Sequence, residues 1–386
     1  MTDQTQIAAI YFPSWHDDAR RSARHGAGFT EWELIKAGKP RFDGHRQPLV
    51  PVLGYRDESA PAAMRQSCDL ARNAGIDAFV WDWYWYDGED FLNRPLNETF
   101  MNLPDPGVKF ALMWANHDWV DVFPATVGKE PEFIWKGAID HAEFVRMTDI
   151  VIERYFRHPQ YWRVNDRAWF TVFRVNELVK GLGGLENTRG ALADFRNRAR
   201  AAGVGELHLN AMEGYAEFSP EQLAGLGLDS LGDYGWCQQW ASPYPTDLVV
   251  DYAQWRANGE QRWHDERARQ IVQVLPTVAM GWDSSTRVRQ EDTIELSVWP
   301  YWPVVVNNTP ESFGEAVGDA IAFTQESDGD HVVVINAWNE WTEGSYLEPE
   351  ARTGDAHLRA LAAAVWAAQA PGGADSSATG HQQHVK

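Results

Sequence analysis

The chain has 386 residues, enough to bury a large core as one domain or two. Its 34 Lys and Arg residues against 55 Asp and Glu residues give a formal net charge of −21, which argues against nucleic acid or an anionic membrane surface as the main partner. The two cysteines, Cys68 and Cys237, are far apart in the sequence and exclude a disulfide framework.

Residues 1–6 are polar apart from Met1, and the apolar stretch that follows covers only residues 7–12. That stretch is too short for a secretory signal, and no run approaches the roughly 18 apolar residues of a membrane span. The sequence therefore predicts a soluble cytoplasmic protein without membrane insertion, and it gives no indication of oligomeric state.

Strand-like runs alternate with helical patterns along the chain. The predicted strands are residues 7–12, 78–83, 110–114, 169–173, 207–211, 230–234, 272–280 and 332–337. The predicted helices are residues 60–74, 141–155, 188–202, 311–325 and 357–368. Gly75 is placed to end the first helix, and Thr309 with Pro310 to start the fourth. Eight βα units predict an α/β protein with a (β/α)8 TIM barrel.

Two segments are expected to be long βα-loop insertions on the catalytic face, residues 14–58 and 283–308. Residues 304–306, inside the second, are an alternative seventh strand. Residues 1–370 are predicted to form one catalytic domain, and residues 371–386 a disordered tail without chemistry. An open doubly wound sheet is the alternative fold, less favoured because no glycine-rich phosphate loop follows the first strand.

The twenty tryptophans indicate a sugar-binding protein, because many stand next to Asp, Asn, His or Glu. A flat aromatic ring beside hydrogen-bonding groups suits a sugar, whose ring has apolar faces and a polar edge. We expect clustered tryptophans to bind sugar, and isolated ones such as Trp366 to pack in the core.

Residues at strand carboxyl ends meet in one pocket if the barrel forms. The residues predicted there to bind an oligo- or polysaccharide are Tyr11, Glu31, Trp32, His45, Asp82, Trp83, Tyr84, Trp114, Asn116, His117, Glu213, Asp233, Tyr234, Trp282, Asp283, Trp338, Asn339 and Trp341.

Glu340 and Glu343 are the predicted catalytic residues. They follow the apolar run 332–335 closely and are three residues apart, near enough for each to raise the pKa of the other. Cleavage of a glycosidic bond requires one carboxyl group to protonate the leaving oxygen and a second to serve as nucleophile or base. Two alternatives remain: one glutamate is catalytic while the other binds an arginine or caps a helix, or neither is catalytic.

Metal and serine chemistry are not predicted. His16, His25, His45 and His117 lack metal-ligand spacing and cysteine partners, and no Gly-x-Ser-x-Gly motif occurs. No cofactor is therefore expected.

Several motifs in order resemble the WbsX-like family, which is similar to glycoside hydrolase family 99, the endo-α-mannosidases and endo-α-mannanases. They are Tyr11-Phe12-Pro13, Gly28-Phe29-Thr30-Glu31-Trp32, Gly44-His45-x-Gln47-Pro48, Trp114-Ala115-Asn116, Asn336-Ala337-Trp338-Asn339-Glu340-Trp341-x-Glu343-Gly344 and Leu347-Glu348-Pro349.

This resemblance implies a retaining hydrolase that cleaves an α-linked glycan through a 1,2-anhydro sugar. We expect cleavage within the glycan chain, because the aromatic clusters extend beyond one sugar ring. Glu340 would then be the base that acts on the 2-hydroxyl, and Glu343 the general acid and base. The chain departs from the family at Asn116-His117-Asp118-Trp119, where Asn-Glu-Asn-Trp is common, and at its more acidic and aromatic run of residues 81–85. The alternatives are a glycosyltransferase or transglycosylase of surface-polysaccharide synthesis, and a non-catalytic carbohydrate-binding protein.

Overall fold

A parallel barrel forms the centre of the molecule. The computed structural model describes residues 4–237, 246–297 and 299–370. Its strands, in sheet order, are β12 (Gln273–Val274), β10 (Ser230–Leu231), β9 (Leu207–Glu213), β8 (Arg167–Arg174), β4 (Lys109–Trp114), β2 (Ala78–Tyr86), β1 (Gln6–Tyr11), β15 (Val332–Asn336) and β13 (Thr277–Ala279). All eight predicted strand regions contribute to this sheet, so the predicted α/β-barrel class is confirmed. The predicted tail, residues 371–386, lies outside the described residues.

One stretch of chain closes the ring of strands. β12 pairs in parallel with β10 at one end of the sheet order, and β13 pairs in parallel with β15 at the other. Only Leu275 and Pro276 separate β12 from β13, so both ends of the order belong to the predicted seventh strand, 272–280. The competing run became β14 (Val304–Val306), which pairs with β11 (Val249–Asp251) outside the barrel.

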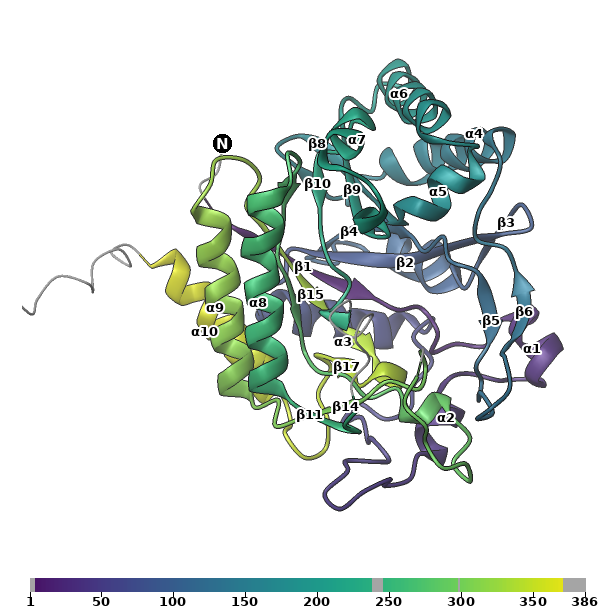
Figure 1. Ribbon diagram of the computed structural model, residues 1–386, viewed down its shortest axis with the longest axis vertical. Helices are drawn as coiled ribbons and strands as arrows, with labels where there is room; N and C mark the ends of the chain where they lie inside the picture. Colours follow the sequence, from purple (N-terminus) through teal and green to yellow (C-terminus); the bar gives the residue numbers. More distant parts are fainter. Residues whose placement is uncertain (1–3, 238–245, 298, 371–386) are drawn as a thin grey trace, which may run out of the picture.

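Helices flank the barrel on its outside (Figure 1). They are α1 (Ala19–His25), α2 (Trp32–Ala37), α3 (Pro61–Asn73), α4 (His141–Ile150), α5 (Val175–Gly181), α6 (Leu185–Ala201), α7 (Pro220–Gly225), α8 (Tyr252–Arg269), α9 (Pro310–Gln325) and α10 (Ala356–Gln369). α8, α9 and α10 stand together along one flank of the molecule (Figure 1). As predicted, Pro310 is the first residue of α9, and the Thr309 side chain accepts a hydrogen bond from the Ser312 N–H.

The sequence analysis missed α8 altogether. This helix is mostly polar and charged, and among its few apolar residues Tyr252, Trp255 and Trp263 are buried. The apolar stripe is thus narrow, and helical periodicity is weak. α4 is also shorter than predicted, because residues 151–156 continue as the π-helical turn η3 (Val151–Phe156).

Short elements elaborate the loops. The paired strands are β3 (Glu89–Phe91), β5 (Trp119–Asp121), β6 (Glu132–Trp135), β7 (Arg163–Val164), β16 (Asn339–Glu340) and β17 (Ser345–Tyr346). The short helical turns are η1 (Pro95–Thr99), η2 (Phe100–Asn102), η4 (Tyr215–Glu217), η6 (Ser285–Arg287) and η7 (Trp341–Glu343).

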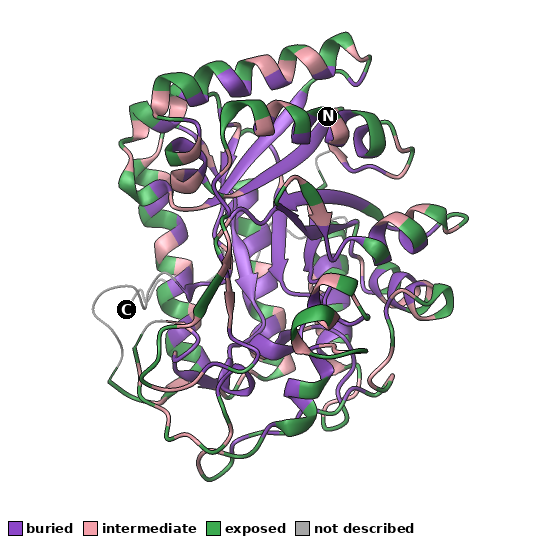
Figure 2. Ribbon diagram, turned by 90° about the vertical axis from the view of Figure 1, so that its right-hand side faces the viewer, coloured by how far each residue is buried: buried purple, intermediate pink, exposed green. Residues whose placement is uncertain are grey.

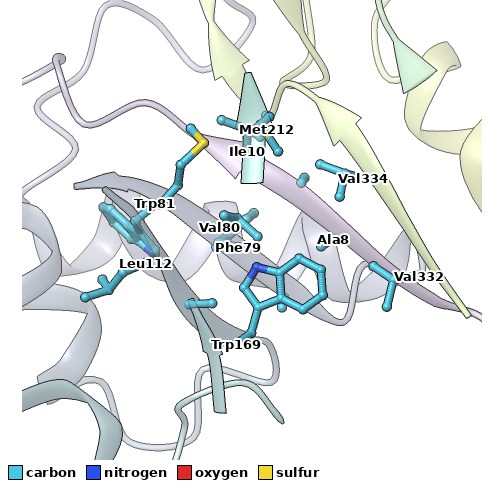
Figure 3. Close-up of a cluster of buried hydrophobic side chains, with 14 of the residues drawn as sticks. Ala8, Ile10, Phe79, Val80, Trp81, Leu112, Trp169, Met212, Val332 and Val334 are labelled. Atoms are coloured by element: carbon cyan, nitrogen blue, oxygen red, sulfur yellow. The ribbon is translucent and has the colours of Figure 1, made fainter. Parts of the chain in front are cut away.

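The barrel strands are buried on both faces, and the helices carry the exposed surface (Figure 2). A buried cluster includes Ala8 and Ile10 of β1, Val80 of β2, and Val332 and Val334 of β15 (Figure 3). Near-continuous burial is typical of parallel strands covered by helices, and it explains their β-branched, apolar composition.

Strand alternation sorts the β2 side chains into two sets. Trp81 packs against Phe100 of η2, with ring centroids 5.7 Å apart, and the Trp83 indole donates to the Tyr155 hydroxyl of η3 at 3.1 Å. Both rings therefore face the outer layer. Asp82 and Tyr84, one position out of phase, face the interior at the carboxyl end of the barrel, because successive side chains of a strand point to opposite faces.

Candidate active site

A cavity of about 310 Å³ lies at the carboxyl ends of the barrel strands. Loops after several strands enclose it, as is general for active sites of this fold. Its lining residues are Phe12, Asp82, Tyr84, Met113, Ala115, His117, Asp118, Trp119, Val120, Val122, Phe123, Phe173, Arg174, Glu177, Glu213, Tyr234, Cys237, Trp282, Arg287, Trp299, Trp302, Glu340 and Glu343.

One arginine holds the two predicted catalytic glutamates together. The Arg287 guanidinium donates through Nη2 to Glu340 Oε1 and through Nη1 to Glu343 Oε1, both at 2.8 Å. Glu340 is 1% exposed and Glu343 is 6% exposed. The glutamates come from the segment after β15, whereas Arg287 comes from η6, in the predicted 283–308 insertion. The two loops thus meet at a buried ion cluster.

A third carboxylate lies behind this pair. Glu31 is fully buried, and its Oε2 accepts hydrogen bonds from the Thr342 hydroxyl at 2.5 Å and from Arg287 Nη2 at 3.3 Å. The other oxygen, Oε1, accepts from the Ser14 hydroxyl at 2.8 Å and faces Arg21 at 3.4 Å. Glu31 therefore orients Arg287 from outside the cavity, and confirms that the 14–58 insertion reaches this face.

Burial controls the protonation of the pair. Burial, together with the neighbouring Glu343 and Glu31 charges, raises the pKa of Glu340 well above its usual value against the lowering effect of Arg287. Burial likewise raises the pKa of Glu343, against Arg287 and hydrogen bonds from Trp299 and Tyr234. Arg287 bonds to both glutamates of the pair and to Glu31, whereas Arg21 reaches only Glu31, so the pair has one guanidinium for two carboxyl groups.

Further titratable groups line the cavity. Burial and the Glu343 charge raise the pKa of Asp82 well above its usual value, and burial raises the pKa of Glu213 to about 7. Burial lowers the pKa of His117 to about 4, so this imidazole is neutral at pH 7. The Tyr234 hydroxyl lies 3.5 Å from Glu343 Oε2, at the distance limit of a hydrogen bond.

The predicted site residues divide into groups. Those that line the cavity are Asp82, Tyr84, His117, Glu213, Tyr234, Trp282, Glu340 and Glu343. Two others hold its wall from behind: the Asn116 amide exchanges hydrogen bonds with the Arg174 backbone at 2.7 and 2.8 Å, and Asn339 does the same with Phe12 at 2.8 and 3.0 Å.

Another group lies away from the cavity. Tyr11 stacks on Trp81, Trp32 on Trp15, and Trp341 on Tyr346. Trp83, Trp114 and Trp338 pack in the core. The His45 imidazole pairs with Asp283 at 2.8 Å, and Asp233 accepts from the Gly235 and Trp236 N–H groups. Their placement corrects the expectation that every strand-end residue reaches one pocket, since alternate side chains leave a strand on opposite faces.

The expectation for isolated tryptophans also needs correction. Trp366 on α10 is 61% exposed rather than packed in the core. Its neighbours on the helix face are alanines, and its position on the solvent side of α10 was not evident from spacing alone.

Sequence reasoning missed several cavity residues. Arg287 stands in a Ser-Ser-Thr-Arg run that carries no recognised motif. Trp299 donates its indole N–H to Glu343 Oε1 at 3.2 Å, and Trp302 lines the same wall. The Trp299-Pro300-Tyr301-Trp302-Pro303 run within an insertion already assigned to the catalytic face was the available signal for these aromatic residues.

The barrel and its cavity define an α/β-barrel protein with the fold of glycoside hydrolases. Solved structures agree: the family 99 endo-α-mannosidase from Bacteroides thetaiotaomicron, in complex with Bis-Tris propane, superposes with a TM-score of 0.57 at 14% identity, covering 96% of this chain and 98% of that one. A glycoside hydrolase-like protein superposes with a TM-score of 0.58 at 13% identity, covering 94% of each chain.

The chain belongs to the family described as glycosyltransferase WbsX, whose model matches residues 7–361. Uncharacterized protein WxcX of Xanthomonas campestris pv. campestris is 29% identical over 372 residues, in two strains. That match covers 92% of this chain and 48% of the relative, so the chain spans about half the length of the curated relatives it matches.

Two further features of the described residues concern membrane spans and metal binding. None of the described helices combines the length and the apolar character needed to cross a bilayer. Within residues 4–237, 246–297 and 299–370, no group of three or more His, Cys, Asp or Glu side chains is arranged to hold a metal ion.

Proposed function

We propose that the protein is a retaining glycoside hydrolase that cleaves an α-linked glycan, mannose-type or related, with a free 2-hydroxyl. The observation that carries this proposal is the pair of buried glutamates on one cavity wall, joined through Arg287. Glycoside hydrolysis depends on two carboxyl groups held in different protonation states. A purely binding protein has no need of such a pair.

The proposed reaction proceeds through a 1,2-anhydro sugar. Glu340, ionised, takes the proton of the 2-hydroxyl as O2 forms a bond to the anomeric carbon, while Glu343 gives its proton to the leaving oxygen as the glycosidic bond breaks. Water then opens the anhydro ring: Glu343 takes a water proton, the water oxygen bonds to the anomeric carbon, and O2 regains its proton from Glu340. The role order follows the family 99 resemblance.

Arg287 supports a pair in which one glutamate is ionised and the other is protonated. A single guanidinium bonds to both carboxylates at 2.8 Å, so it balances one negative charge and leaves the other glutamate to hold a proton in its buried surroundings. Thr342 donates to Glu31 and lies 3.1 Å from Glu340 Oε1, which fixes the orientation of the base. The arginine is therefore a positioning residue.

Aromatic rings from separate loops form much of the remaining wall, including Phe12, Trp119, Trp282, Trp299 and Trp302. Aromatic faces beside carboxylates match the apolar and polar sides of sugar rings. Because these rings come from several loops, we propose contact with more than one sugar and cleavage within a glycan chain.

The test measures reducing ends released from a panel of α-linked glycans. We expect Glu340→Gln and Glu343→Gln each to lose about 10³-fold or more in rate, since each group supplies several kcal/mol. Glu186→Gln, on the exposed surface of α6, is the matched control and should keep full activity. Bis-Tris propane should be left out of the buffer, because the family 99 endo-α-mannosidase of similar fold forms a complex with it. Activity that survives in both cavity variants would contradict the proposal.

A second candidate is glycosyl transfer, as the family description indicates. A transglycosylase would use the same glutamates, with a sugar hydroxyl replacing water in the second step. Transfer from a nucleotide sugar is less well supported: among the described cavity residues, both guanidiniums, Arg174 and Arg287, already face carboxylates rather than a free diphosphate site. Products that appear only with an added nucleotide sugar, and not with glycan alone, would favour the transferase.

A further inference from the structure

The cavity contains more acidic than basic groups. Its acidic lining residues are Asp82, Asp118, Glu177, Glu213, Glu340 and Glu343. Among the described lining residues the guanidiniums are Arg174 and Arg287, and each is engaged: Arg174 faces Glu213 at 3.5 Å, and Arg287 bonds to both catalytic glutamates. His117 adds no positive charge at pH 7, because burial lowers its pKa to about 4. The cavity thus has a surplus of carboxyl groups.

Asp82 provides a second, independent observation. It lines the cavity from the inward face of β2 and is 4% exposed, yet its buried Oδ1 has no hydrogen-bond partner within the protein. An unsatisfied buried oxygen costs free energy, about 1–3 kcal/mol for typical groups. A ligand that offers a hydroxyl or amine to this oxygen recovers that cost.

Building on the proposed function, we infer that the cavity selects its glycan by charge. Asp82 takes a hydrogen-bond-donating group of the sugar, a hydroxyl or an amine, and the cavity excludes sugars that carry a carboxylate or a phosphate. The substrate class is therefore the neutral glycans and those with amino groups at positions other than C2. The C2 position is reserved for the hydroxyl that the proposed reaction needs.

The exclusion has a simple physical cause. A ligand carboxylate in this cavity meets several carboxyl groups in surroundings of low dielectric, where like charges repel strongly. It can bind only if those groups take up protons, so its affinity should fall as pH rises. Burial and the Glu343 charge raise the pKa of Asp82, against the lowering effects of Arg287 and of a hydrogen bond from Tyr84, and a bound anion would raise it further.

The test compares three methyl α-mannosides that differ only at C6: the hydroxymethyl parent, the 6-amino-6-deoxy sugar and the uronate. All keep the 2-hydroxyl. Binding is measured by calorimetry to Glu343→Gln, so that the result does not depend on turnover. We expect the uronate to bind at least tenfold more weakly than the parent at pH 7.5, with a smaller difference at pH 5. The amino sugar should bind as tightly as the parent or more tightly.

Matched variants locate the effect. Adding Asp82→Asn should reduce the discrimination against the uronate severalfold, whereas adding Glu186→Gln, which removes the same charge from the distant surface of α6, should leave it unchanged. If Asp82→Asn does not fold, Asp82→Ser serves in its place. Equal binding of uronate and parent, or no binding by any of the three sugars, would overturn the inference. If the parent sugar binds more tightly than the uronate but no glycan is hydrolysed, the inference of selection by charge stands and the proposed hydrolase function is refuted.

Discussion

Two clusters of arginine and carboxylate lie at opposite ends of the same barrel, and they differ both in burial and in charge balance. At the amino end, Arg167 pairs with Asp229 at 3.0 Å and with Asp330, Arg196 pairs with Asp229 at 2.6 Å, and His208 lies 3.2 Å from Asp330. Here the two arginines balance the charge of the two aspartates. At the carboxyl end, Arg287 pairs with Glu31, Glu340 and Glu343, and the second guanidinium, that of Arg21, faces Glu31 alone.

The pKa values follow from this difference. Hydrogen bonds from His208 and Arg167 lower the pKa of Asp330 although burial raises it, whereas burial raises the pKa of Glu343, the proposed general acid, against the lowering effect of Arg287. A cluster with balanced charges keeps its carboxylates ionised. At the amino end of the barrel, it also links residues that lie at or next to the first residues of several strands. An under-compensated cluster retains protons, which general acid catalysis requires. The structural cluster and the candidate catalytic cluster therefore differ in the ratio of cationic to acidic partners as well as in burial.

Removing Arg287 should have the largest effect on the catalytic cluster. We expect Arg287→Met to lower activity about 10²- to 10³-fold, because the glutamates lose the charge that sets their protonation. Breaking a buried pair in this way costs about 3–5 kcal/mol of stability. The cost should be greater at pH 8 than at pH 5.5, where protons can replace the guanidinium. Urea unfolding of the wild type and the variant at both pH values measures the stability cost, and reaction rates at the same pH values measure the loss of activity.

Arg287→Lys is the matched control for that variant. It keeps the charge but loses the forked geometry, so stability should be largely retained while activity still falls. Equal unfolding free energies for wild type and Arg287→Met at pH 8 would show that the cluster is not held by this arginine.

Asp330→Asn tests the other cluster. The expected result is a loss of about 3 kcal/mol in the free energy of unfolding, with kcat unchanged. The folded-state pKa of Asp330 is lowered, so its stabilising contribution is present above its usual pKa and is lost as pH falls below it. Denaturant unfolding at pH 7 and pH 3 checks both parts. A drop in kcat without a drop in stability would break the distinction between the two clusters.

The pH dependence of stability should have opposite signs at the two ends. Carboxyl groups with raised folded-state pKa values, Glu340 and Glu343, bind protons that the unfolded chain has released, so stability falls as pH rises above their usual pKa. We expect the free energy of unfolding to decrease between pH 5 and pH 8. In the double variant Glu340→Gln/Glu343→Gln, the free energy of unfolding should depend less on pH. An unchanged pH dependence would show that other groups bind these protons.

Glu213→Gln should have the smallest effect. Burial raises the pKa of Glu213 to about 7, but its partner Arg174 is 45% exposed at the cavity edge. We expect KM to rise severalfold, with kcat within about threefold, as for a contact that binds substrate and transition state equally. Steady-state kinetics on the cleaved glycan separates the two constants. A kcat loss comparable to that of Glu343→Gln would move Glu213 into the reaction itself.

The barrel could be predicted from the sequence because each of its strands has a recognisable local residue pattern. Runs such as residues 332–335, apolar and β-branched on both faces, are typical of a buried parallel strand, and eight of them with intervening helices leave few alternative folds. Pro276 interrupts the seventh run without ending it, so the strand was recognised although it divides into β12 and β13. α8 was missed because its apolar stripe is narrow.

The sequence by itself also determined where the glutamate pair stands, since Glu340 and Glu343 directly follow a strand end. Tertiary structure decided their environment. Arg287 reaches the pair from a segment more than fifty residues away, and Glu31 from the other end of the chain. No local sequence pattern indicates that these residues are in contact, because the contact depends on how two loops pack together. The alternation of β2, by contrast, follows a local rule: it separates inward Asp82 from outward Trp81 and Trp83, because a strand presents neighbouring side chains to opposite faces. The prediction that Trp83 binds substrate beside Asp82 did not apply this rule.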